Sequence, residues 1–267
     1  MQPSHPLLRW LACPLLVAAA TAALAEQATI VSLGTGLRYR HVEESGARGR
    51  RLLTERGLAP GLDLEIGHRL GAGTLFGGIG VRDYGLDYDG QSQAGRPLET
   101  RSSYFENRLW AGYRFALGER WSLGMRWERS RVERDIRATA AVAGLEERYS
   151  QDWAAIGLRH RLAGGPVEWV EAEWHRSIGG TLRVSSPGVI DRVWIPLGAS
   201  RGFSVSARIP LGAAGWFDHI DLEPGLSRTR SAASPSRSWR LGGVVQGTIN
   251  EPERDEWQLG AGLRLSW

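Results

Sequence analysis

The last eleven residues of the chain alternate strictly between two kinds of position. Apolar side chains occupy every odd position from 257 to 267, and polar residues or glycine occupy every even position between them. A period of two residues is the pattern of a β-strand with one apolar face and one polar face. A strand that crosses a membrane as part of a barrel has this pattern, because its apolar face contacts lipid and its polar face lines the lumen.

The same alternation recurs along the chain after residue 26. Twelve segments carry it, and the 3.6-residue period of an amphipathic helix does not compete with it. Each segment has about the length that a tilted strand needs to cross a bilayer, roughly ten residues. The segments are centred on residues 31–39, 62–70, 75–81, 105–117, 121–127, 156–162, 170–174, 193–197, 203–211, 220–226, 239–245 and 257–267.

The connections between these segments alternate in length. Tight joins are predicted at residues 70–74, 117–120, 162–166 and 197–202, and long polar stretches at 43–55, 87–101, 137–147 and 177–191. Short turns on one side and long loops on the other are typical of membrane barrels, whose strand number is even when both termini lie on the short-turn side. We therefore predict an all-β fold over residues 26–267: a transmembrane, antiparallel, up-and-down β-barrel of about 12 strands, with 10 as the alternative.

The first 25 residues have the features of a secretory signal peptide. Arg9 precedes an apolar run over 11–24, and a small-x-small site ends at Ala25, after which we expect cleavage. Cys13 is the only cysteine, and Trp10 three residues before it does not suit a lipidation site. The mature chain would then lack cysteine, so no disulfide or thiolate metal site is expected, and no cofactor or other metal site is implied.

The terminal strand resembles the C-terminal assembly signal of bacterial outer-membrane β-barrel proteins. Trp267 supplies the final aromatic residue, and Leu263 and Leu265 occupy the alternate apolar positions before it. The resemblance implies recognition by the outer-membrane insertion machinery. It also implies a location in the outer membrane of a Gram-negative bacterium, in contact with lipid and lipopolysaccharide.

Composition agrees with this class and excludes others. No stretch after residue 26 approaches 18 consecutive apolar residues, so a helical membrane protein is excluded. The net charge of +4 is spread along the chain, and without a clustered basic face we expect no nucleic-acid partner. Aromatic residues gather at the ends of the predicted strands, as two belts at the membrane interfaces would require. The predicted belts contain Tyr39, Trp127 and Trp257 near the long loops, and Phe115, Trp121 and Trp267 near the short turns.

Charged residues of both signs occupy the predicted inward face. In a narrow barrel, facing arginine and carboxylate side chains can meet and pair across the lumen. Such a network either braces a closed barrel or lines a small selective pore, and we favour bracing because arginine is long and the signs are mixed. The predicted lumen-lining residues are Arg38, Arg40, Glu65, Arg82, Glu106, Arg108, Arg126, Glu128, Arg159, Glu171, Glu173 and Arg264.

Two constellations bear on an enzymatic role. His175 and Ser177 are similar to the histidine and serine of outer-membrane phospholipases and lipid A deacylases, in which histidine activates serine for acyl transfer. The following residues 178–180 (Ile-Gly-Gly) depart from that family's asparagine-containing continuation. The alternation also directs both side chains into the lumen, away from the lipid surface.

A second, acidic constellation resembles that of omptin-type proteases, whose Asp and Asp-His pairs activate water at the barrel mouth. It comprises Asp83, Asp87 and Asp89 in one predicted outer loop, with His219 and Asp221 further along the chain. The residues around them do not match the family. The alternative interpretation is a solvated loop that binds a cation weakly at most.

The sequence thus favours an outer-membrane barrel with a narrow charged lumen and a structural or small-solute channel role. One alternative is a lipid-modifying hydrolase of the phospholipase or deacylase kind, although an enzyme is the less favoured class. The other is a surface-binding or assembly protein that acts through its loops. In that case Arg48, Arg50 and Arg51 could contact the phosphates of anionic sugar lipids.

Overall fold

The computed structural model describes residues 29–46, 49–91, 97–140 and 142–267, which form thirteen β-strands. The predicted signal peptide, residues 1–25, lies outside the described residues. Within them, no helix is long and apolar enough to cross a membrane. The strands are β1 (Thr29–Ser45), β2 (Arg51–Leu70), β3 (Gly73–Gln91), β4 (Pro97–Ala116), β5 (Trp121–Ile136), β6 (Leu145–Arg161), β7 (Trp169–Ser186), β8 (Ile190–Pro196), β9 (Ser200–Ala214), β10 (Phe217–Ser231), β11 (Arg237–Leu241), β12 (Val244–Ile249) and β13 (Glu253–Ser266).

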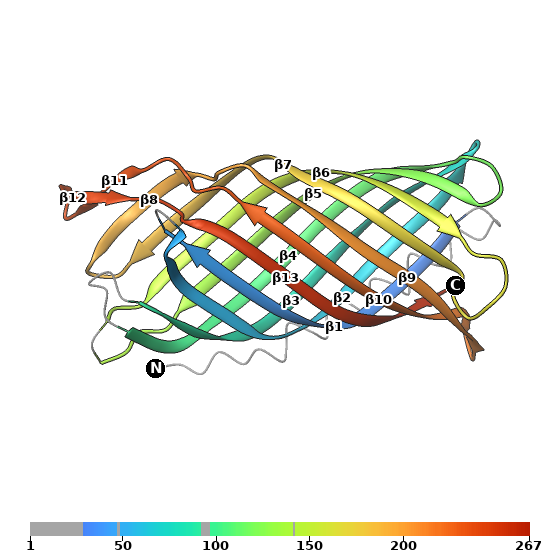
Figure 1. The fold of residues 1–267 in the computed structure, drawn as a ribbon, viewed down its shortest axis with the longest axis horizontal. Coiled ribbons are helices and arrows are strands. Elements are labelled where there is room, and N and C mark those ends of the chain that lie inside the picture. Colours follow the sequence, from blue (N-terminus) through green and yellow to red (C-terminus); the bar gives the residue numbers. More distant parts are fainter. Residues whose placement is uncertain (1–28, 47–48, 92–96, 141) are drawn as a thin grey trace.

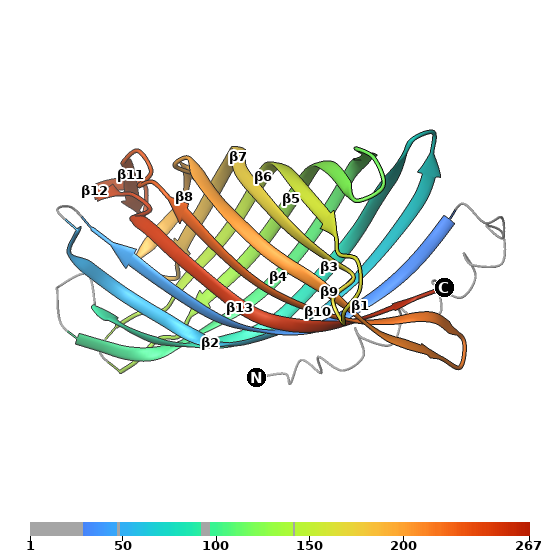
Figure 2. The same cartoon turned by 45° about the vertical axis from the view of Figure 1, so that its right-hand side comes forward.

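Ten of these strands form a closed antiparallel barrel. Strands β1 to β7 pair in sequence order, followed by β9, β10 and β13. Strand β13 then pairs with β1 from Ser32↔Ser266 to Ser45↔Glu253, which closes the sheet. Figures 1 and 2 show the steep tilt of the strands around the barrel. The predicted fold class is confirmed, with ten strands, the alternative count, in the barrel.

The apolar band that faces lipid covers only the part of the barrel nearer its short turns. Trp121 and Phe115 lie at one edge of this band, and Tyr39, Trp127 and Trp257 at the other, all with exposed side chains. These are the positions that the two predicted belts require. We call the barrel beyond the second belt the outer zone, because the long connections leave from it.

In the outer zone the alternation continues, but the apolar side chains now point into the barrel and the polar side chains point outward. Tyr84 and Leu86 of β3 are buried in a core inside the barrel, together with Val42, Ala59 and Tyr104. The intervening positions on the outer wall are exposed and polar. The barrel strands are therefore 14 to 20 residues long rather than about ten. Most of the predicted loops 43–55, 87–101 and 177–191 is strand, whereas in 137–147 only residues 145–147 are strand.

Two of the twelve predicted strands lie outside the closed barrel. The segment 193–197 is largely β8, which pairs with the outer end of β7 beyond the point where β9 takes over. The segment 239–245 contributes to the β11–β12 hairpin, a separate two-stranded sheet. Both extend from the outer zone, at the left of Figure 1. Alternation marks a two-faced strand, but it does not show which strand is its partner.

Glycines with positive φ form the short turns where the sequence predicted them. Gly71 (φ 59°), Gly118 (φ 95°) and Gly164 (φ 76°) lie in the first three predicted joins. The fourth prediction, at 197–202, was wrong, since that segment joins β8 to β9 in the outer zone. The fourth short turn instead joins β9 to β10 and contains Gly215 (φ 63°).

Candidate functional site

The interior of the barrel holds a cavity of about 1040 Å³ on its short-turn side. Glu119 and Arg120 of the β4–β5 turn are among its lining residues, so the cavity extends to the short-turn end of the barrel. Arg38, Arg82 and Gln258 are among the residues that line the part of the cavity nearer the outer zone. The Arg38 guanidinium donates a hydrogen bond to the Gln258 side chain at 3.3 Å.

Arginine–carboxylate pairs line the wall of this cavity. All of these pairs except Arg126–Glu128, which lies within β5, join side chains from two strands, so they brace the wall and neutralise charge that the lumen would otherwise expose. The pairs are Arg126 Nη2–Glu173 Oε1 (2.7 Å), Arg159 Nη2–Glu171 Oε2 (2.6 Å), Arg264 Nε–Glu223 Oε1 (2.8 Å) and Arg264 Nη1–Glu65 Oε1 (3.2 Å); Arg126 also pairs with Glu128.

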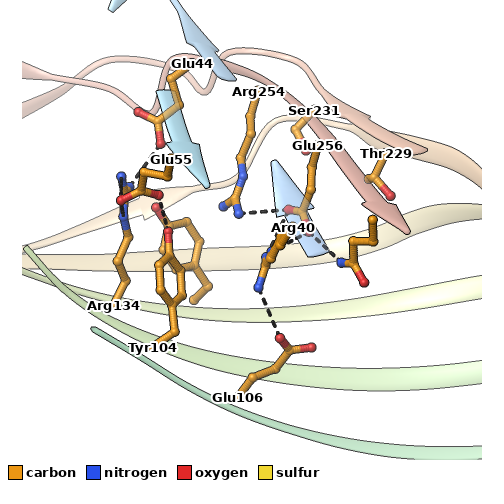
Figure 3. Close-up of polar contacts among 12 residues, drawn as sticks. Arg40, Glu44, Glu55, Tyr104, Glu106, Arg134, Thr229, Ser231, Arg254 and Glu256 are labelled. Carbon is orange, nitrogen blue, oxygen red and sulfur yellow. Dashed lines mark hydrogen bonds and ion pairs between the residues drawn. The ribbon is translucent and has the colours of Figure 1, made fainter. Parts of the chain in front are cut away.

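A layer of charged side chains crosses the lumen above the cavity. Arg40 of β1 contacts Glu256 of β13 (Nε–Oε1, 2.7 Å) and Glu106 of β4 (Nη1–Oε2, 3.3 Å), as Figure 3 shows. Arg82 of β3 contacts the other oxygen of Glu106 at 3.0 Å. We call these four residues the mid-lumen layer. Arg108 adjoins them and pairs with Asp63 at 2.9 Å.

A second layer, which we call the outer layer, lies inside the outer zone around Arg134 of β5. Its guanidinium contacts Glu44 of β1 at 3.0 Å, Glu55 of β2 at 3.0 Å and Glu147 of β6 at 2.8 Å. The Arg134 side chain is only 2% exposed and that of Glu55 is 0% exposed. Tyr104 also donates a hydrogen bond to Glu55, in the view of Figure 3. Three carboxylates from three strands thus converge on one buried cation.

Tyr149 connects the outer layer to the segment that precedes β13. Its hydroxyl lies 2.9 Å from an oxygen of Glu147 and 2.9 Å from an oxygen of Glu251. One hydroxyl proton cannot be donated to two carboxylates, so one of the two carboxyl groups must be protonated and donate to the tyrosine oxygen. Burial raises the pKa of Glu251 well above its usual value, and the charges of Glu147 and Glu44 raise it further. The raised pKa of Glu251 favours its protonated form.

The structure brings the twelve predicted lumen residues into contact with inward-facing partners, but the sequence missed the outer layer. Glu44, Glu55 and Glu147 fell inside stretches predicted to be loops. A signal was present in Tyr84, Leu86 and Tyr88, which alternate with polar residues in the predicted loop 87–101 and just before it. That alternation continues the strand register with apolar residues turned inward.

His175 and Ser177 both point into the barrel, but they do not form a catalytic pair. His175 Nε2 lies 3.0 Å from the Thr229 hydroxyl, and the Ser177 hydroxyl accepts a hydrogen bond from the Ser200 backbone amide at 2.8 Å. In the described part of the chain no hydrogen bond joins the two residues. Their arrangement is that of side chains that tie β7 to β9 and β10.

The acidic constellation is also dispersed. Asp83, Asp87 and Asp89 belong to β3 and point outward in the outer zone. His219 and Asp221 lie at the opposite end of the barrel, where His219 is the strand partner of Ser266. Across the described ranges, no three His, Cys, Asp or Glu side chains are grouped as metal ligands would be.

Several solved structures match this chain over most of its length. The outer-membrane protease OmpT of Escherichia coli superposes with a TM-score of 0.58 at 11% identity, over 91% of this chain and 98% of that one. The translocator domain of the autotransporter NalP from Neisseria meningitidis has a TM-score of 0.45 at 12% identity, over 93% and 92%. The P. putida toluene transporter TodX has a TM-score of 0.36 at 10% identity, over 92% and 91%.

This chain has the fold of an outer-membrane β-barrel. The superposition on OmpT carries that assignment, because its TM-score exceeds 0.5 while it covers almost all of both chains. At 11% identity it establishes the fold and not the activity. No protein-family model matches the sequence, and no curated protein sequence matches it.

Proposed function

We propose that this protein resides in the outer membrane as a closed barrel with a structural role. On this proposal the signal peptide is removed after Ala25, and the insertion machinery recognises the strand that ends in Leu263, Leu265 and Trp267. Lipid and lipopolysaccharide are the partners of its outer wall. The outer zone then stands above the membrane as a rigid, polar platform.

The mid-lumen layer is the observation that carries this proposal. Arg40 and Glu106 lie on strands separated by β2 and β3, and their contact runs through the lumen rather than along its wall. Arg134 and Glu44 make a comparable contact one layer further out. Opening a path for solutes would separate buried charges from their partners, which costs about 3–5 kcal/mol for each broken pair. Two such layers favour a closed lumen over a channel.

The alternative functions receive less support. A hydrolase needs a nucleophile in contact with its base, and His175 contacts Thr229 rather than Ser177. OmpT is a protease, but the acidic residues in this chain that resembled the omptin pattern lie at opposite ends of the barrel. The toluene transporter TodX supports no comparison of activity at its TM-score.

Conductance in a planar bilayer tests the closed lumen. We expect no unitary currents from the refolded mature protein, with folding verified by its heat-shifted gel mobility. The comparison variant R40S/E106S/R134S removes the crossing contacts of both layers but keeps the packed outer-zone core of Tyr84, Leu86 and Tyr104. Currents from this variant, with none from the unaltered protein, would show that the charged layers are what close the lumen. Stable unitary currents from the unaltered protein would overturn the proposal. They would make the lumen arginines and glutamates the determinants of a selective pore.

A further inference from the structure

Three arginines occupy directly paired positions on the outer wall of the barrel. Arg176 of β7 is the strand partner of Arg201 of β9, and Arg201 aligns with Arg230 of β10. Side chains opposite one another on neighbouring strands have Cβ atoms about 4.5–5.5 Å apart, and like charges at that spacing repel. All three residues are exposed. We call this row the arginine ladder.

The ladder lies directly above the apolar band. On β7 the preceding outward residue is Trp174, and on β9 the next outward residue toward the membrane is Phe203, both exposed to lipid. On β10, Arg228 lies between the ladder and the band, with its guanidinium 4.4 Å from the ring centre of Trp257. An aromatic row topped by cations marks the level at which lipid headgroups begin.

The positive charge of this region is not balanced by protein carboxylates. Asp255 pairs with Arg228 at 2.6 Å and with Arg230 at 2.9 Å, so one carboxylate serves both. Among the described residues, no carboxylate forms an ion pair with Arg176 or Arg201, in contrast to the nearly universal pairing inside the lumen. Glu43, the strand partner of Asp255 on β1, adds negative charge on the β13 side of the row, so the positive charge without a carboxylate partner lies at Arg176 and Arg201.

We propose that the arginine ladder binds the phosphorylated headgroup of an anionic sugar lipid in the outer leaflet. Guanidinium groups form paired hydrogen bonds with phosphate oxygens, and a phosphate between Arg176 and Arg201 relieves their mutual repulsion. Trp174 and Phe203 offer apolar surface to the acyl chains just below. That continuity favours a lipid headgroup over free phosphate.

This site differs from the loop arginines that the sequence suggested for the same chemistry. Arg51 begins β2 at its outer end, far from the apolar band, and Arg50 immediately precedes it; Arg48 lies outside the described residues. The inference rests on the outer-membrane location proposed above and assigns a site to one of the proposed partners. It holds whether or not the lumen conducts.

Binding of defined lipids to the folded mature protein in neutral detergent tests the ladder. The probes are lipopolysaccharide with a truncated sugar core, the same lipid after removal of its phosphates, and inorganic phosphate, and the readouts are tryptophan fluorescence and native mass spectrometry. We expect the phosphorylated lipid to bind at least ten-fold more tightly than the dephosphorylated one. Inorganic phosphate at millimolar concentration should not compete with it.

The variant R176Q/R201Q should lose this ten-fold preference. The matched control is R56Q/R101Q, which removes two exposed arginines that flank Asp87 on the other side of the outer zone. It should keep the preference. R176K/R201K retains the charge but not the planar guanidinium, so it should bind with intermediate affinity and report on the site even if the glutamine variant folds poorly. The proposal is overturned if R176Q/R201Q binds like the unaltered protein, or if free phosphate displaces the lipid.

Discussion

Arg134 shows how one residue organises the interior above the membrane. It reaches from β5 to carboxylates on β1, β2 and β6, and its side chain is almost completely buried. Burying an ion pair is costly in itself, so such a cluster is weak evidence of a net gain in stability. Removing one member is a different matter, because the partners are left charged and unpaired in a site with little water.

We therefore predict a large effect for Arg134→Leu. The free energy of unfolding should fall by about 3–5 kcal/mol, the usual loss when one partner of a buried pair is removed. Urea unfolding of the protein in lipid vesicles measures it. The control is Arg148→Leu, since Arg148 and its partner Glu133 are both 50% exposed and the pair should contribute only about 0–1 kcal/mol. Equal losses in the two variants would contradict this view of the outer layer.

Glu251 gives the same region a dependence on pH. Its pKa in the folded protein is raised by burial and by Glu147 and Glu44, so its stabilising contribution is fully present below the unfolded pKa and is lost as pH rises through the raised value. Glu55 affects the dependence of stability on pH in the opposite direction. Arg134 and the hydroxyls of Ser102 and Tyr104 lower its pKa against burial, so its contribution is lost as pH falls through that lowered value.

The variant Glu251→Gln isolates the first effect, because glutamine imitates the protonated carboxyl at every pH. Its stability relative to the unaltered protein should increase as pH is raised above the usual range of a glutamate. The heat-modifiability midpoint measured from pH 5 to pH 9 reports this difference. The other groups that face Glu251 (Glu147, Glu44, Arg134, Arg254 and Tyr149) are unchanged in the variant. A difference that stays constant with pH would show that Glu251 does not hold the proton.

At the scale of elements, the accessory strands differ from the barrel strands in what they pair with. Strand β8 pairs only with the outer end of β7, and the two strands of the β11–β12 hairpin pair with each other. Neither contributes a member to the closed ring of ten. The two ends of the segment that contains the hairpin lie close together. The Ser234 backbone amide donates a hydrogen bond to the Glu251 carbonyl oxygen, and the Glu251 backbone amide donates one to the Ser234 hydroxyl.

This geometry predicts that the hairpin can be removed without loss of the barrel. Replacing residues 236–249 with Asn-Gly lets a two-residue turn join Pro235 to Asn250, next to the retained pair of Ser234 and Glu251. The shortened protein should refold to a heat-modifiable barrel in detergent. A proline at Gly225 in β10 is the contrasting control, because it removes a ladder hydrogen bond inside the closed sheet and should impair refolding. Failure of the shortened protein to refold would place the hairpin in the folding core.

At the scale of the whole molecule, the barrel consists of two zones with opposite polarity. In the zone nearer the short turns, apolar side chains face outward and charged side chains face the cavity. In the outer zone, aromatic and aliphatic side chains such as Tyr84, Leu86 and Leu182 face inward and the outer wall is polar. The first zone is arranged for lipid outside and water inside. The second has the arrangement of a water-soluble barrel with a packed core, which explains why the lumen is filled there.

The local sequence pattern by itself determined much of the structure of this protein. The alternation of residues such as those from Trp257 to Trp267 depends on strand geometry alone, and turn glycines such as Gly71 and Gly118 depend on backbone sterics. Fold class, aromatic belts, three of the four short turns and the inward face of the lipid-spanning zone were therefore predictable.

Only the tertiary structure decided the strand count, the two lumen layers and the arginine ladder. Each of these depends on which strands are neighbours and in what register. Arg176 and Arg201 are 25 positions apart in the chain, and Arg134 and Glu44 are 90 apart. Alternation assigns each of these side chains to a face of its own strand, but closure of β13 on β1 and the stagger of ten strands set which side chains meet.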